Sequence, residues 1–365
     1  MLNFIKSIIA YNFYKITGFP KILPIILTFS VNDWCNSKCK TCNIWKNNPM
    51  EKIKEELALD EISRIFANFN KLYWLTITGG ETFLRNDLNE IIKTIYDRSK
   101  PKVITIATNG MTTKKIILWT QDILDYCKQL NLVINLSLDG IGKQHDEIRG
   151  VKNNFDLTTK TLIELKKLNH PRLTVGVNTV ISNYNVKDFP EIYTYIKNNF
   201  GPDSYIAEVA EHRAKLYNIE LEITPEINEY QKALLFLIDS LKTPSERHVP
   251  EIIRILRMEF YEYLMKQYSL KNFEGIASAY IMHNGDVWSS YTRPFVIGNL
   301  REVNYDFKKL WFNGKAKHFR KVMNNAEYNT TLANAFYTNI LCSPSKILKL
   351  WLDRKIKSLS KKSFQ

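Results

Sequence analysis

Hydrophobic and polar positions alternate along the first 210 residues with a regular rhythm. Short runs of β-branched and other apolar residues, bounded by turn residues, are typical of buried strands. We predict six strands, over residues 24–31, 72–78, 103–108, 132–138, 173–181 and 203–209. Between them, apolar residues at positions i, i+3 and i+4 predict helices over 59–69, 87–97, 115–129, 157–168 and 188–199.

This alternation predicts an α/β fold built from repeated βαβ units around a parallel sheet. We expect a partial (β/α)6 TIM-like barrel, although a doubly wound open sheet would produce the same pattern at this level. Beyond residue 210 the rhythm stops, and helices are predicted over 230–241 and 252–267. Short strand-like pieces around the Asn284-Gly285-Asp286 turn then predict a small α+β C-terminal extension as a separate unit.

The chain is accordingly divided into five predicted parts. They are an N-terminal amphipathic segment (1–24), a core (25–215), a helical linker (216–274), the C-terminal extension (275–345) and a basic amphipathic tail (346–365).

The composition supports a large buried core, because 45% of the residues are hydrophobic and 12% are aromatic. Lys and Arg outnumber Asp and Glu by 51 to 37, which gives a net charge of +14. That excess favours anionic partners such as nucleic acid, a membrane surface or acidic substrates. A Lys-, Asn- and Ile-rich composition explains it equally well. The chain contains no recognisable nucleic-acid-binding module, so no nucleic-acid partner is predicted.

The cysteines point to metal chemistry. There are five, and Cys35, Cys39 and Cys42 lie within eight residues of one another. An odd number with this clustering is a poor disulfide framework and favours a reducing cytoplasm. No apolar run reaches the roughly 18 residues that a membrane-spanning helix needs. The first ten residues lack a cleavage pattern, so we do not expect a signal peptide.

The three clustered cysteines have the spacing C-x3-C-x2-C and follow the first predicted strand. Loops at the carboxyl ends of parallel strands form active sites, and thiolates are the preferred ligands of iron–sulfur clusters. Three thiolates on a four-iron cluster leave one iron open to a substrate or cofactor. The alternative is a zinc site, which needs a fourth ligand from Cys127, Cys342 or one of six histidines.

Further motifs follow the next predicted strands in order. They are Thr78-Gly79-Gly80-Glu81, Thr108-Asn109-Gly110, Ser137-Leu138-Asp139-Gly140 with Arg149 nine residues after Gly140, and Val177-Asn178-Thr179 within the fifth strand. Together with the cysteine triad, they resemble the radical S-adenosylmethionine (SAM) superfamily over about residues 25–210. One departure is Thr41, because the residue before the third cysteine is usually aromatic in that family.

The resemblance implies one [4Fe–4S] cluster held by Cys35, Cys39 and Cys42, which are therefore the predicted metal ligands and catalytic residues. It also implies SAM as a second cofactor, with the following predicted contacts: Gly79, Gly80, Glu81, Thr108, Asn109, Ser137, Arg149 and Asn178. In the family, the Glu and adjacent backbone bind the methionine amino group, and the Arg pairs with the carboxylate of SAM. Reductive cleavage of SAM then yields a 5′-deoxyadenosyl radical that abstracts hydrogen from substrate. A low-potential donor, flavodoxin or ferredoxin, is an implied partner.

Residues 276–342 resemble the SPASM/twitch extension of many radical SAM enzymes. In that extension, cysteines hold auxiliary clusters, whereas Ser289-Ser290 stands here where a cysteine is usual, and only Cys342 remains. We therefore predict a degenerate, cysteine-poor extension without a cluster. The absence of an auxiliary cluster favours epimerisation, carbon–carbon bond formation or SAM recycling over net two-electron oxidation.

The substrate stays open at this level. A peptide is the commonest substrate of relatives with such an extension, and a lipid or glycan is the second hypothesis. A non-catalytic metal-binding or interaction protein of the same fold is the alternative function. Glu208, Glu211 and Arg213 are candidate substrate contacts after the sixth strand, and His145 and Asp146 are weaker candidates.

Tyr337, Thr338 and Asn339 are further candidates for the mouth of the barrel. Both ends of the chain are basic and amphipathic, which predicts either peripheral contact with an anionic membrane or packing against the core.

Overall fold

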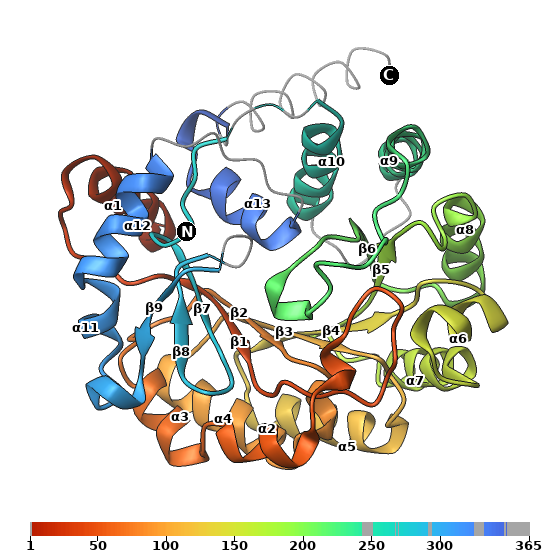
Figure 1. Ribbon diagram of the computed structural model, residues 1–365, viewed down its shortest axis with the longest axis horizontal. Coiled ribbons are helices and arrows are strands. Elements are labelled where there is room, and N and C mark those ends of the chain that lie inside the picture. The colour runs from red at the N-terminus through yellow and green to blue at the C-terminus, as the bar shows by residue number, and fades with distance from the viewer. Residues whose placement is uncertain are drawn as a thin grey trace.

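The computed structural model describes residues 2–242, 251–266, 268, 270–290, 294–324, 332–346 and 348. Its centre is a curved nine-stranded sheet in the order β6-β5-β4-β3-β2-β1-β7-β8-β9 (Figure 1). The six parallel strands of the barrel are β1 (Ile26–Ser30), β2 (Trp74–Thr78), β3 (Val103–Thr108), β4 (Asn131–Ser137), β5 (Leu173–Ile181) and β6 (Ser204–Val209). The C-terminal strands are β7 (Ser278–Ile281), β8 (Asp286–Trp288) and β9 (Val296–Asn299).

Helices surround this sheet. Those of the first half are α1 (Leu2–Thr17), α2 (Pro49–Glu55), α3 (Leu59–Phe66), α4 (Leu88–Ser99), α5 (Thr113–Tyr126), α6 (Lys143–Arg149), α7 (Asn154–Lys167) and α8 (Phe189–Phe200). The second half contributes α9 (Ile227–Lys242), α10 (Glu251–Lys266), α11 (Phe307–Trp311), α12 (Gly314–Asn324) and α13 (Ala333–Leu341). Helices α3 to α8 cover the outer face of the parallel strands, and α13 lies across the open side (Figure 1).

The periodic sequence pattern explains these elements. Within β1, Leu27 and Phe29 are fully buried while Ile26 and Thr28 are only partly buried, as expected when alternate side chains face opposite sides of a sheet. In α3, the apolar residues Ile62, Ile65 and Phe66 form one buried stripe. These side chains belong to a single hydrophobic cluster that continues from β1 to α13. The barrel and the C-terminal extension therefore share one core.

The predicted α/β barrel is confirmed, with β3 and β5 at the predicted bounds and the other barrel strands displaced by one to a few residues. The C-terminal extension is joined to the barrel more closely than the expected separate unit. Strand β7 pairs in parallel with β1, from Ile26 opposite Ser278 to Phe29 opposite Ile281, and β8 and β9 continue the sheet as antiparallel strands. This pairing satisfies the edge of β1, which would otherwise expose unpaired backbone groups.

The two predicted amphipathic ends have different outcomes. The N-terminal segment forms α1, which packs on the core through Tyr11 and Tyr14 in a cluster with Phe273, Ile276 and Cys342. The predicted basic tail lies almost wholly outside the described residues. Within the part of the chain that the structure describes, no helix combines the length and apolar character needed to cross a bilayer.

Candidate active site

The three clustered cysteines lie in the loop that follows β1. Their side chains line one cavity of about 350 Å³ at the carboxyl ends of the barrel strands. The loop turns back on itself through a hydrogen bond from Cys42 N to Cys39 O (3.3 Å), and the Ser37 amide donates to Cys35 Sγ (3.4 Å). A short loop of this kind delivers three thiols to the same space, as the spacing predicted.

Three glycines form the surface on which the cysteine loop rests. A Cβ added to Gly80 would lie 1.9 Å from the Trp34 carbonyl oxygen, and one added to Gly79 would lie 2.8 Å from the carbonyl oxygen of Asn32. On the other side, a Cβ at Gly150 would approach the Lys38 carbonyl oxygen to 2.3 Å. Only glycine permits such close backbone contact, so Gly79-Gly80 is required by packing as well as by any ligand.

The segment after β6 holds the same loop from behind. The buried ammonium of Lys215 donates to Ser30 Oγ (2.6 Å) and pairs with Asp33 (3.3 Å). Tyr217 OH donates to the second oxygen of Asp33 (2.7 Å), and Asn218 Nδ2 donates to the Thr41 carbonyl (2.8 Å). This anchoring cluster was missed by the sequence analysis, because Lys215 and Asn218 lie in a polar stretch without a motif.

Burial controls the protonation of the three thiols. Desolvation, together with the charge of nearby Cys39, raises the pKa of Cys35 to about 12 and that of Cys42 to about 11. Burial also raises the pKa of Cys39, and the neighbouring Arg149 guanidinium opposes that shift. A metal group bound here would replace thiol protons, because thiolates are the ligating form.

Arg149, the last residue of α6, carries an unused donor beside these thiols. Its Nη1 pairs with Asp139 Oδ2 at 3.0 Å, while its buried Nε has no hydrogen-bond partner. Asp139 is itself fixed by the Val180 amide, which donates to Oδ1 (2.8 Å). A buried unpaired donor on a permanent cation is costly unless a ligand satisfies it, so Arg149 is positioned to bind an anionic group.

His145 is a structural residue of the same turn. Its Nδ1 accepts a hydrogen bond from Asp139 N (3.0 Å), so Nε2 carries the proton and donates to Asn154 Oδ1 (2.8 Å). The ring is fully buried, and desolvation lowers its pKa from 6.5 to about 4. Asp146 likewise orders the chain, accepting from the amides of Asn153 and Phe155. Both bonding patterns match the loop-ordering interpretation rather than ligand contact.

Glu81 lies behind the cavity wall. Its carboxylate is almost fully buried and accepts hydrogen bonds from Thr108 Oγ1 (2.7 Å), Asn109 N (2.6 Å) and Phe83 N (3.0 Å). Asn109 in turn donates through Nδ2 to Asn36 and Ser37 of the cysteine loop. In this structure Glu81 thus holds the ends of β2 and β3 and the cysteine loop together.

The predicted SAM contacts divide into two groups. Gly79, Gly80, Arg149 and Asn178 line the cavity with the three cysteines, whereas Glu81, Thr108, Asn109 and Ser137 are not among its lining residues. Asn178 Oδ1 is buried without a hydrogen-bond partner. Of the lower-ranked candidates, Tyr337 and Thr338 line the cavity, and Asn339 is used instead to accept from the Phe273 amide (2.7 Å).

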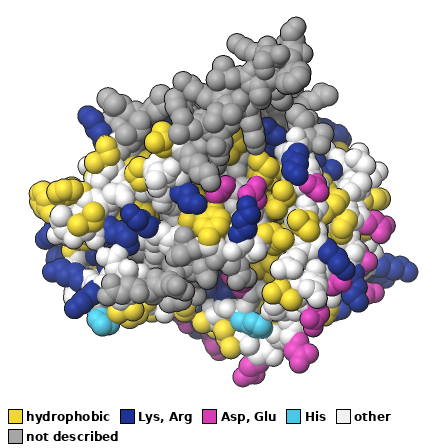
Figure 2. All heavy atoms as spheres, turned by 90° about the horizontal axis from the view of Figure 1, so that it is seen from above, with side chains coloured by type: hydrophobic (Ala, Val, Ile, Leu, Met, Phe, Trp, Pro, Cys, Tyr) yellow, Lys and Arg dark blue, Asp and Glu magenta, His cyan; other side chains and the backbone are white. Residues whose placement is uncertain are grey.

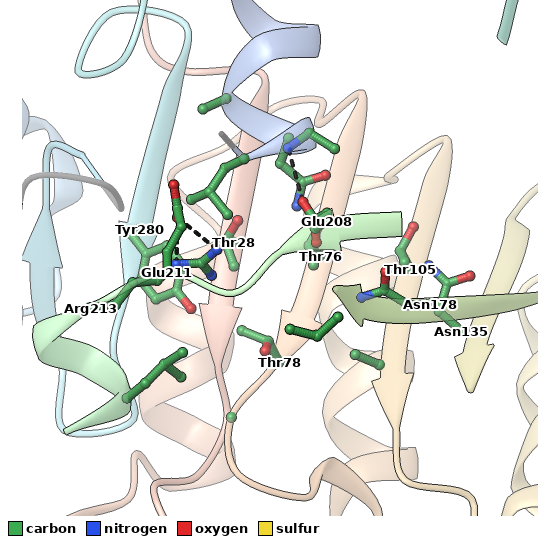
Figure 3. A pocket seen from close by; sticks show the side chains of 18 of the residues that line it. Thr28, Thr76, Thr78, Thr105, Asn135, Asn178, Glu208, Glu211, Arg213 and Tyr280 are labelled. Atoms are coloured by element: carbon green, nitrogen blue, oxygen red, sulfur yellow. Dashed lines mark hydrogen bonds and ion pairs between the residues drawn. The ribbon is translucent and has the colours of Figure 1, made fainter. Parts of the chain in front are cut away.

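The upper cavity is walled by the end of β6 and by the C-terminal extension (Figure 3). Glu208 accepts a hydrogen bond from Ala333 N (2.9 Å), at the first residue of α13, and burial raises its pKa. Glu211 pairs with Arg213 at 2.8 Å. Thr28, Thr76, Thr78, Thr105 and Asn135, from β1 to β4, line the same cavity (Figure 3). The cavity is therefore polar inside the barrel and bears acidic and basic groups at its mouth.

The remaining cysteines do not enter this cavity. Cys127 is buried at the end of α5, as expected of a small apolar residue, and Cys342 is buried in the cluster against α1. Among the described residues, no three His, Cys, Asp or Glu side chains converge as ligands of a single ion do.

Comparison with known proteins identifies the family of the core. Residues 29–196 match the model of the Radical SAM superfamily. The GTP 3′,8-cyclase of Mannheimia succiniciproducens is 29% identical over 174 residues, which are 47% of this chain and 49% of the cyclase. The Fe-coproporphyrin III synthase of Methanosarcina barkeri is 24% identical over 313 residues, 78% of this chain and 73% of the synthase. The chain thus spans about half the length of the cyclase.

A solved structure shares the fold over most of the chain. Streptococcus suis SuiB bound to S-adenosylmethionine superposes with a TM-score of 0.59 at 15% identity, covering 88% of this chain and 75% of SuiB. SuiB bound to its precursor peptide SuiA gives a TM-score of 0.58 at 15% identity, over 94% of this chain and 76% of SuiB. The likeness extends beyond the barrel into the C-terminal extension.

Because Gly80 packs against the Trp34 carbonyl oxygen, we predict that Gly80→Ala displaces the cysteine loop. Since the obstructing atom is a backbone carbonyl oxygen, we expect a loss of about 1–3 kcal/mol in the free energy of unfolding, with reduced iron after anaerobic reconstitution. Urea unfolding and iron analysis measure both. Gly314→Ala is the matched control, because a Cβ there meets nothing within 4 Å. Equal stability and iron content in the two variants would contradict the packing account.

The buried neutral His145 predicts a specific sensitivity to acid. Its pKa is about 4 in the folded chain and near 6.5 when unfolded, so the unfolded state gains the proton first as pH falls below 6.5. The contribution to stability should fall by about 2 kcal/mol between pH 7.5 and pH 5. In urea unfolding at both pH values, His145→Gln should lose less stability than the parent over this interval. If the difference in unfolding free energy between the parent and His145→Gln were the same at both pH values, His145 would have an ordinary pKa in the folded chain and the prediction would be wrong.

Proposed function

Because this chain belongs to the radical SAM superfamily, we propose that it binds one [4Fe–4S] cluster through Cys35, Cys39 and Cys42 and cleaves SAM to initiate radical chemistry on a substrate in the cavity. The supporting observation is that the three thiols line the same cavity as Arg149, whose buried Nε has no hydrogen-bond partner. Three thiolates fit a cluster with one iron left for SAM, and Arg149 fits the SAM carboxylate. A cluster held there would supply the electron for reductive cleavage of the S–C5′ bond of SAM, which would yield methionine and the 5′-deoxyadenosyl radical.

In this proposal, the protein's own residues orient SAM and enclose the reacting groups. Arg149 is suited to grip a carboxylate because Asp139 fixes the plane of its guanidinium. Asn178 Oδ1 offers an acceptor to a bound donor group at the end of β5. Helix α13, joined to the end of β6 through Glu208 and Ala333, covers the mouth of the barrel and limits the access of water. A low-potential donor, flavodoxin or ferredoxin, would deliver the electron.

We propose a peptide as the first substrate class to test. The fold likeness to SuiB, which has been solved with its precursor peptide, includes the C-terminal wall of the cavity. In this chain that wall carries Ser289 and Ser290 rather than cysteines, and the extension contains only the buried Cys342. The cavity mouth bears Glu211, Arg213 and Tyr337, which can bind the polar backbone and side chains of an extended segment. A lipid or glycan remains the second substrate class.

The scarcity of cysteines in the extension, where Cys342 is the single one in the sequence, also bears on the outcome of the reaction. With no auxiliary cluster to accept an electron, the substrate radical would be quenched by reduction, by recombination or by return of hydrogen. We therefore propose an outcome without net two-electron oxidation of the substrate, namely epimerisation, SAM recycling, or carbon–carbon bond formation in which the substrate radical adds to an unsaturated carbon and is then reduced.

The test is the formation of 5′-deoxyadenosine. Anaerobically reconstituted protein should produce it from SAM in the presence of dithionite, and Cys35→Ala/Cys39→Ala/Cys42→Ala should not. Cys127→Ala is the control, because that thiol is buried outside the cavity. A reconstituted parent that leaves SAM intact would assign the chain to the alternative, a non-catalytic metal-binding protein of this fold.

A further inference from the structure

Helix α1 is hydrophobic on two opposite faces. One face is buried, with Ile8, Tyr11 and Tyr14 against the core. The other exposes Ile9 by 62%, Phe13 by 54% and Ile16 by 83%, at positions i, i+4 and i+7. Phe19, just beyond the helix, adds a fourth exposed apolar side chain at 67%. A helix that is apolar on both faces is ordinarily covered on both.

The helix is docked firmly, so its outer face is a fixed surface. Tyr11 OH donates to the Leu23 carbonyl (2.7 Å), Asn12 Nδ2 donates to the Cys342 carbonyl (2.8 Å), and Lys15 Nζ donates to the Asn272 carbonyl (2.9 Å). The last two of these bonds join α1 to segments more than 200 residues away in sequence. Ile9, Phe13, Ile16 and Phe19 consequently point outward together; we call them the apolar row.

A cationic helix, α12, packs beside α1. Arg320 of α12 donates to Tyr14 OH (3.0 Å), and Asn324 donates to the Lys15 carbonyl, so α12 packs along α1. The exposed lysines of α12 are Lys315, Lys317 and Lys321. Residues 1–32 and 307–326 contain no Asp or Glu. At the left edge of Figure 2, on the side where α1, α11 and α12 lie, Lys and Arg side chains surround hydrophobic ones and no acidic side chain is visible.

From this juxtaposition we propose that the α1–α12 face docks on an anionic lipid surface, with the apolar row entering the interface and the lysines of α12 contacting headgroups. Isolated side chains that protrude from a convex helix suit a soft bilayer interface, whereas a rigid protein partner would need matching pockets. Lysines near an anionic leaflet add attraction that falls with salt. This surface lies away from the cavity, and the proposal does not depend on the radical chemistry.

Charge argues against two other occupants of this face. The C-terminal segment 346–365 carries seven Lys or Arg and one Asp, so it would repel the lysines of α12. A second copy related by two-fold symmetry would bring like charges together across the contact. An anionic partner is the one that the described surface attracts.

The test is co-sedimentation of the full chain with two kinds of vesicle. One is phosphatidylcholine alone, and the other contains about 30% phosphatidylglycerol, which makes its surface anionic. We expect binding to the anionic vesicles only, reduced several-fold at about 0.5 M salt. Phe13→Ser/Ile16→Ser and Lys317→Glu/Lys321→Glu should each lower the bound fraction at least fivefold. Leu118→Ser/Leu235→Ser is the matched control, because it removes two exposed apolar side chains from α5 and α9; it should bind as the parent does.

Three results would overturn the proposal. The first is a parent chain that stays in the supernatant with anionic vesicles. The second is unchanged binding by Phe13→Ser/Ile16→Ser, which would place the membrane contact elsewhere, for example in the basic tail. The third is a parent dimer in light scattering that this variant converts to a monomer, which would make the face a contact between copies. Thermal unfolding of each variant distinguishes lost binding from lost fold.

Discussion

The position of the three cysteines depends on how one loop packs against three other segments of the barrel. Residues 31–47 follow β1, and their backbone meets Gly79 and Gly80 after β2 and Gly150 after α6 at distances that no side chain allows. The third contact is the buried pair of Lys215 and Asp33. Removing one partner of a buried ion pair leaves an uncompensated charge and costs about 3–5 kcal/mol. The two glycine contacts and the buried ion pair thus fix the position of the loop, and the loop in turn sets where the three thiols lie.

The open side of the barrel is completed by the C-terminal half of the chain. Strand β7 satisfies the free edge of β1, and the carboxylate of Glu208 on β6 binds the first amide of α13. The same elements that stabilise the sheet therefore enclose the cavity. Substrate recognition can change through the residues of this wall, such as Glu211, Arg213 and Tyr337, without any change at the cysteine loop.

The sequence predicted the barrel because buried parallel strands and their helices leave strong local periods, and it located the cysteines because their spacing is local. It did not reveal contacts formed between distant segments. Lys215 and Asp33 are 182 residues apart and belong to no motif. The SAM contact of Glu81 stays a prediction, and the sequence did not show that its carboxylate accepts hydrogen bonds from Thr108 and Asn109, because that depends on where β3 ends. The two-faced character of α1 likewise became clear only when Tyr11 and Tyr14 proved to be buried.

The central claim is that Cys35, Cys39 and Cys42 hold a four-iron cluster with one iron available to SAM. The most direct measurement is electron paramagnetic resonance of the dithionite-reduced protein, with and without SAM, on samples of known iron content. The account predicts about four irons per chain, as expected for a single [4Fe–4S] cluster, and a reduced-cluster signal that changes when SAM binds. Zinc in place of iron, or a cluster signal unaffected by saturating SAM, would contradict it.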